Sequence, residues 1–131
     1  LVEPGSFVLD IQQAAPYFRK QGALGFINSF VNNALPGMKH PITGVFDVLE
    51  LLYHTHPTQH NGLSLAVSHD TILAAIVAVI SGNKQIEQSD WPDMMEGLFV
   101  WFEGEDFSNS KLKWIWRGQK HELVIKDFQN K

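Results

Sequence analysis

The hydrophobic pattern is sharpest in the middle of the chain. Five apolar residues, Leu63 to Val67, end at a polar break. A run this short and this apolar fits a strand buried on both faces, as in a parallel sheet. From Asp70 onward apolar residues recur at helical spacing, with alanines between them, until Ser81-Gly82, and glycine is typical of a helix C-terminus. We therefore predict a strand over 63–67, a polar turn, and a buried helix from Asp70 to residue 80.

This predicted turn carries three polar residues, Ser68, His69 and Asp70. Open α/β sheets bind ligands at the carboxyl ends of their strands, and the free N–H groups at a helix N-terminus bind anions. The pattern therefore predicts an anion-binding site here. A purely structural interpretation is also strong: Asp70 caps the helix, since aspartate is among the best capping residues, and His69 is an ordinary turn histidine.

Three helical runs are predicted upstream. The first follows a cap at Asp10, and Pro16 breaks or restarts it, with loosening at Gly22 and Gly25. In the second, Ile27, Phe30, Val31 and Leu35 repeat at helical spacing. The third opens at Thr43 or Gly44, and Val45, Val48, Leu49 and Leu52 share one face. Tyr17, Phe26 and Phe30 could form a lid over a substrate, but core packing is the simpler interpretation.

The last third of the chain favours strands. After a polar stretch (83–90) and a loop with a helical turn (91–95), aromatic-rich runs over 98–102, 111–116 and 121–125 predict antiparallel hairpins, connected by 103–110 and 117–120. The economical arrangement is an antiparallel edge on an otherwise parallel sheet. The four tryptophans are better explained by cross-strand packing than by a ligand platform.

Composition narrows the class of protein. The chain has 131 residues, 44% of them hydrophobic and 18% charged, which is a globular balance. A net charge of −4 without a basic stripe argues against nucleic acid as a partner. No apolar run approaches the length of a membrane span. With no cysteine there is no disulfide or thiolate metal site in this segment, and the cluster His54, His56 and His60 lacks metal-hydrolase spacing, so neither a metal nor a cofactor is predicted.

Residues Ser68 to Ala75, with His-Asp-Thr leading into a small-apolar helix, resemble the C-terminal signature of the histidine phosphatase superfamily, in the branch of histidine acid phosphatases and phytases. Trp91-Pro92, Glu96 and the run Leu98 to Phe102 resemble the same branch's later segment. The resemblance implies an α/β fold, part of a three-layer α/β/α phosphoglycerate-mutase-like architecture with a central parallel strand and antiparallel edge strands. The all-helical, metal-dependent His-Asp phosphohydrolases share only the dipeptide, and there it lies on helices.

The resemblance also implies an activity. In that family a histidine in an Arg-His-Gly motif attacks the phosphorus of a phosphomonoester and forms a phosphohistidine intermediate. By position, His69 is the later histidine that binds phosphate, Asp70 is the acid that protonates the leaving alcohol, and we assign phosphate binding to Thr71 as well. Because the mutase-like branch lacks this aspartate, Asp70 favours hydrolysis over transfer, with an acidic optimum.

The sequence contains no Arg-His-Gly, and Arg19 and Arg117 are its two arginines. We therefore expect residues 1–131 to be one C-terminal segment of a phosphatase domain, inactive alone and completed by an N-terminal half that carries the nucleophile. An exposed apolar strand edge would make it pair with that half or with a second copy of itself. The alternative is a non-catalytic binding module that recognises a phosphorylated ligand or a partner chain. Family-typical localisation is secreted or lysosome-like.

Overall fold

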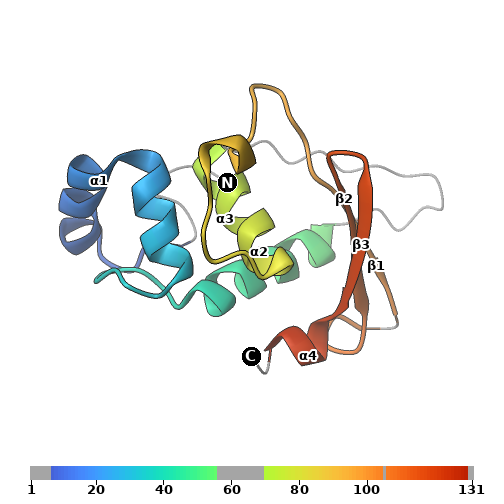
Figure 1. The fold of residues 1–131 in the computed structure, drawn as a ribbon. Coiled ribbons are helices and arrows are strands. Elements are labelled where there is room, and N and C mark those ends of the chain that lie inside the picture. The colour runs from blue at the N-terminus through green and yellow to red at the C-terminus, as the bar shows by residue number, and fades with distance from the viewer. Residues whose placement is uncertain (1–6, 56–69, 105, 130–131) are drawn as a thin grey trace.

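The computed structural model describes residues 7–55, 70–104 and 106–129. The chain is a mixed α/β protein with a three-stranded antiparallel sheet. Figure 1 shows α1 on one side, the sheet on the other, and α3 between them. The predicted parallel strand 63–67 lies outside the described residues. The elements, in chain order, are α1 (Ile11–Val31), α2 (Pro41–Thr55), α3 (Asp70–Ser81), the 3₁₀ turn η1 (Gln88–Asp90), β1 (Phe99–Glu103), β2 (Lys111–Trp116), β3 (Gln119–Val124) and α4 (Ile125–Gln129).

The first helix bends at Gly22 rather than at Pro16. Asp10 caps α1 as predicted, because its Oδ1 accepts a hydrogen bond from the Gln12 N–H at 3.0 Å. The predicted interruption at Pro16 is wrong: the helix continues through it, and the hydrogen bond it cannot donate is lost near an exposed helix end, where water can replace it. Gly22 adopts φ 74° and ψ 174°, which folds α1 into two arms.

Two asparagines one turn apart connect the second arm of α1 to the segment after α3. The Asn28 amide donates to the Ile86 carbonyl at 2.8 Å and accepts from the Ile86 N–H at 2.6 Å. The Asn32 amide donates to the Lys84 carbonyl at 2.8 Å. These side chains bind backbone groups of an extended segment as a neighbouring strand would. They fix the start of the loop that leads through η1 to β1.

The other two long helices follow the predicted hydrophobic faces. α2 begins at Pro41, two residues before the predicted start, because proline suits the first helical position, where its missing N–H would have no partner. Val45, Val48 and Leu49 are fully buried, as predicted. α3 has the predicted bounds to within one residue, is buried along most of its length, and packs against both α1 and α2.

The sheet has the order β1-β2-β3, and both predicted hairpins are confirmed. β3 begins at Gln119, earlier than predicted, because Arg117 (φ 52°) and Gly118 (φ 77°) form a two-residue turn with positive φ at both positions. Leu112 and Trp114 point to the covered face, and Trp114 packs across the strands on His121, at 5.3 Å between ring centroids. An aromatic cluster joins α2 to this face: Phe46, Tyr53, Phe102 and Phe107.

Candidate functional site

Asp70 is the first residue of α3, and its carboxylate accepts two hydrogen bonds. Oδ1 accepts from the Thr71 N–H at 2.8 Å, and Oδ2 accepts from the Trp91 indole Nε1–H at 2.9 Å. The first bond is local and joins adjacent residues, whereas an N-cap side chain accepts from the N–H two or three residues on, so it is not the capping bond that the structural interpretation predicts. The second joins residues 21 positions apart, and a helix cap does not require it. His69 and Ser68 lie outside the described residues, so their predicted roles stay predictions.

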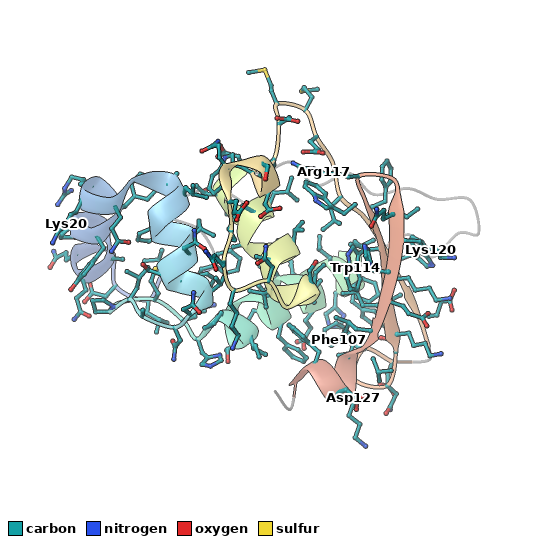
Figure 2. All side chains as sticks on the ribbon, viewed as in Figure 1. Lys20, Phe107, Trp114, Arg117, Lys120 and Asp127 are labelled. Carbon is teal, nitrogen blue, oxygen red and sulfur yellow. The ribbon has the colours of Figure 1, made fainter. Side chains whose placement is uncertain are left out.

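Arg117 clamps the segment that carries Trp91 to the β2-β3 turn. Its Nη1 donates to the Ser89 carbonyl at 2.7 Å and its Nη2 to the Trp91 carbonyl at 2.9 Å. Its Nε and Nη2 also donate to the two carboxylate oxygens of Glu96, at 2.9 and 3.1 Å. This two-point geometry is specific to the planar guanidinium. Figure 2 shows Arg117 where the hairpin turn meets the loop.

The clamp is also an electrostatic feature. Hydrogen bonds from Arg117, and then from the Asp93 N–H, lower the pKa of the Glu96 carboxyl below its ordinary value. The same hydrogen bond to Glu96 raises the pKa of Arg117. The sequence resemblance included Glu96, but it did not predict Arg117 as the partner of Glu96. The one available signal was an Arg-Gly pair between two strand-like runs, which predicts a turn and not the contacts made across it.

Thr71 is buried, with 7% of its surface exposed. Its backbone N–H, the second of the helix, donates to the Asp70 carboxylate and is therefore not free to bind an anion. Within the part of the chain that the structure describes, its Oγ1 has no hydrogen-bond partner. A buried hydroxyl without a partner is costly, so this atom is a candidate for contact with a ligand. The predicted phosphate-binding role of Thr71 therefore requires a ligand that enters the space beside it.

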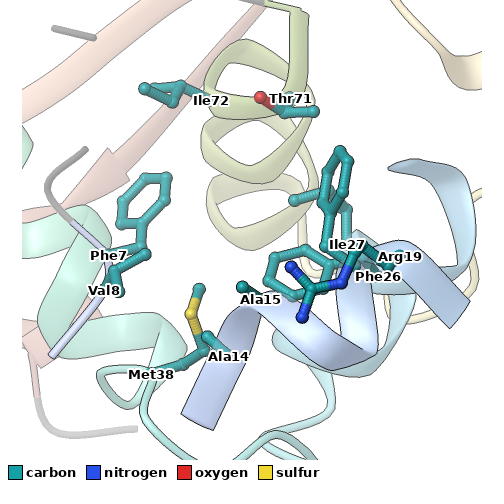
Figure 3. Close-up of a pocket in the computed structure, with 11 residues that line it drawn as sticks. Phe7, Val8, Ala14, Ala15, Arg19, Phe26, Ile27, Met38, Thr71 and Ile72 are labelled. Carbon is teal, nitrogen blue, oxygen red and sulfur yellow. The ribbon is translucent and has the colours of Figure 1, made fainter. Parts of the chain in front are cut away.

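That space is a cavity of about 380 Å³ between the two arms of α1 and the start of α3 (Figure 3). Its walls are mainly apolar, and three phenylalanine rings contribute to them. Arg19 and Thr71 supply its polar groups. The lining residues are Phe7, Val8, Ala14, Ala15, Phe18, Arg19, Phe26, Ile27, Met38, Thr71 and Ile72.

The aromatic residues considered for a lid divide between core and cavity. Phe30 is buried and stacks on Phe7 with the ring centroids 5.0 Å apart. Phe26 is buried and forms part of the cavity wall. Tyr17 is 38% exposed and does not line the cavity. The core interpretation is thus confirmed for Phe30, while Phe26 belongs to both the core and the cavity.

Two further features bear on function. Of the histidine cluster, His54 lies in the last turn of α2, and His56 and His60 fall outside the described residues. Across 7–55, 70–104 and 106–129, no three histidine, aspartate or glutamate side chains are grouped closely enough to hold a metal ion. The helices of these same ranges include none with the length and apolarity needed to cross a membrane.

In comparisons with known proteins, no family model, curated protein or solved structure matches this chain. The fold class and the geometry around Asp70 are therefore the findings from which a function is argued.

Proposed function

We propose that this chain is the C-terminal part of a phosphomonoesterase of the histidine acid phosphatase type. In this proposal the strand 63–67 is the central parallel strand of a three-layer α/β/α fold, and it delivers His69 and Asp70 to the site. The observation that carries the proposal is the Trp91–Asp70 hydrogen bond. It joins Asp70, in one segment that resembles this family (68–75), to Trp91, in the later segment whose resemblance supports it (91–102). Segments so far apart in sequence had no need to meet if each resemblance were accidental.

The proposed chemistry assigns one task to each residue. A histidine of the N-terminal half attacks phosphorus, so a N–P bond forms as the P–O bond to the alcohol breaks. Asp70 gives its proton to the departing oxygen, and His69 holds the phosphate oxygens; water then releases phosphate from the phosphohistidine. Asp70 is exposed at the start of α3, so substrate can reach its carboxyl. A positioned general acid of this kind contributes about 10²- to 10⁴-fold to the rate.

The test is hydrolysis of phenyl phosphate by the polypeptide that the gene encodes, including any residues upstream of Leu1. Asp70→Asn is expected to lower kcat by about 10²- to 10⁴-fold. Asp127→Asn is the matched control, because Asp127 is an exposed aspartate in the first turn of another helix, α4. Equal activity of the two variants would refute the role of Asp70. The absence of hydrolysis in the wild type would refute the phosphatase.

The non-catalytic module remains the second candidate, because the unpartnered Thr71 hydroxyl beside the cavity favours ligand binding whether or not a reaction follows. Calorimetric titration with inorganic phosphate separates the two. Binding without turnover of any phosphomonoester favours the module.

A further inference from the structure

The cavity beside Thr71 carries an inference about the substrate. Small-molecule sites commonly enclose about 300–1,000 Å³ and combine apolar walls with a few polar groups. The cavity of about 380 Å³ fits this description. An apolar cavity of about 150 Å³ already holds benzene, so this one has room for an alkyl chain of several carbons or for two fused rings.

The walls favour an apolar body. Phe7 and Phe26 are buried at 3% and 7% exposure, and Phe18 is 39% exposed, which places its ring at the boundary with solvent. Phe18 and Phe26 pack edge to face with their ring centroids 5.2 Å apart. The two arms of α1 reach the same space because the chain turns at Gly22, so the cavity is a product of the fold and not a gap between loops.

The polar groups favour an anion on that body. Arg19 lines the cavity, and the ion pairs of the described residues are made by Lys39, Lys113 and Arg117, so the charge of Arg19 is not neutralised by a carboxylate among them. Thr71 offers its unpartnered hydroxyl from the wall formed by α3. Thr71 directly follows Asp70, so the wall that α3 contributes to the cavity begins one residue along the chain from the candidate site.

We propose that this cavity holds the alcohol portion of the substrate, and that the substrate class is phosphomonoesters of apolar alcohols rather than of polyols. The part of this inference that concerns hydrolysis of the ester rests on the proposed function. The apolar body packs against the phenylalanine rings, the Thr71 hydroxyl bonds to a phosphate oxygen, and Arg19 attracts the phosphate by its charge. Polyol esters are disfavoured because their hydroxyl groups would lose water and find few partners in the cavity.

The test compares hexyl phosphate with methyl phosphate, whose alcohols leave with the same chemistry and differ only in apolar length. Each buried methylene contributes about fourfold, less the cost of ordering the chain. We expect the polypeptide encoded by the gene to prefer the hexyl ester at least about tenfold in kcat/KM, through KM. Calorimetry with hexylphosphonate and methylphosphonate measures the same preference as a ratio of Kd values, without turnover.

Substitutions locate the preference in the cavity. Ala15→Phe fills the space and should reduce the hexyl-to-methyl ratio towards one in both assays, whereas Ala34→Phe, at an exposed alanine outside the lining, should leave it unchanged. If Ala15→Phe does not fold, Phe18→Ala at the boundary removes an apolar wall and should lower the ratio several-fold. Arg19→Met should weaken both phosphonates, and Lys20→Met, at the exposed neighbouring residue, should weaken neither.

The outcomes separate the two proposals. Hydrolysis with no preference for the hexyl ester, or a preference that Ala15→Phe leaves intact, overturns the cavity assignment and spares the phosphatase. Binding of hexylphosphonate that Ala15→Phe abolishes, without hydrolysis of either ester, supports the cavity as a site for apolar phosphorus ligands and overturns the catalytic proposal. The absence of both binding and hydrolysis overturns both.

Discussion

Asn28→Ala should destabilise the protein far more than its neighbour one turn away, Asn32→Ala. Asn28 satisfies both the N–H and the carbonyl of Ile86, a residue that is 5% exposed. Removing the amide leaves two backbone groups at a buried residue without partners. Each such loss costs about 1–2 kcal/mol, so the expected total is about 2–4 kcal/mol. Asn32 bonds to the exposed carbonyl of Lys84, where water can replace it, so its loss should cost about 1 kcal/mol or less.

The assay is urea unfolding followed by circular dichroism. The free energies of unfolding of the two variants are compared, provided that both have the same slope of free energy against urea concentration. Asn28 lies in the interior of α1, where alanine is favoured over asparagine by a few tenths of a kcal/mol, whereas Asn32 is the C-cap of the helix. Helix propensity therefore offsets a small part of the loss at Asn28 only, and the expected difference remains in the same direction. If Asn28→Ala costs no more than Asn32→Ala, the two bonds to Ile86 do not anchor the loop. Other contacts would then have to hold the segment between Ile86 and Trp91 in its position.

Three further results are expected. Gly104→Ala should destabilise the protein by about 1–3 kcal/mol, because Gly104 has φ 152° and an added Cβ would lie 2.7 Å from the Cα of Ser110. Gly97→Ala, where an added Cβ would meet open space, should be near neutral in the same urea assay. Trp91→Phe should lower kcat for phenyl phosphate about tenfold, the equivalent of one positioning hydrogen bond, and equal kcat would exclude that role. The pKa of Glu96 is lowered in the folded state, so its bond to Arg117 stabilises the protein above pH 4.5, and this stabilisation is lost as pH falls through the folded pKa. The difference in urea midpoint between wild type and Glu96→Gln should therefore vanish in acid. A difference that stays constant with pH would contradict this.

Periodic features could be predicted from sequence because each depends on neighbours along the chain. The 3.6-residue period after Asp70 gave the bounds of α3, and alternation from Lys111 to Trp116 gave the covered face of β2. The interruption predicted at Pro16 is wrong because the loss of one hydrogen bond near a helix end costs less than the cooperative turns on either side contribute.

Features that depend on distant contacts could not be predicted. The Arg117 clamp and the Asn28–Ile86 bonds join residues 21 to 58 positions apart, and nothing local in the sequence encodes such pairs. The cavity likewise requires the turn at Gly22 to bring both arms of α1 to the start of α3. At the candidate site, residue type and spacing predicted Asp70, but its bond to Trp91 emerged only in the folded structure.

The central claim is that Asp70 gives its proton to the leaving alcohol, and its most direct test is the dependence of the Asp70→Asn defect on the leaving group. Phenol and simple alcohols need that proton, whereas p-nitrophenol departs readily as an anion. The account predicts a loss in kcat of about 10²- to 10⁴-fold for phenyl phosphate and a much smaller loss for p-nitrophenyl phosphate. An equal loss for both esters would contradict it.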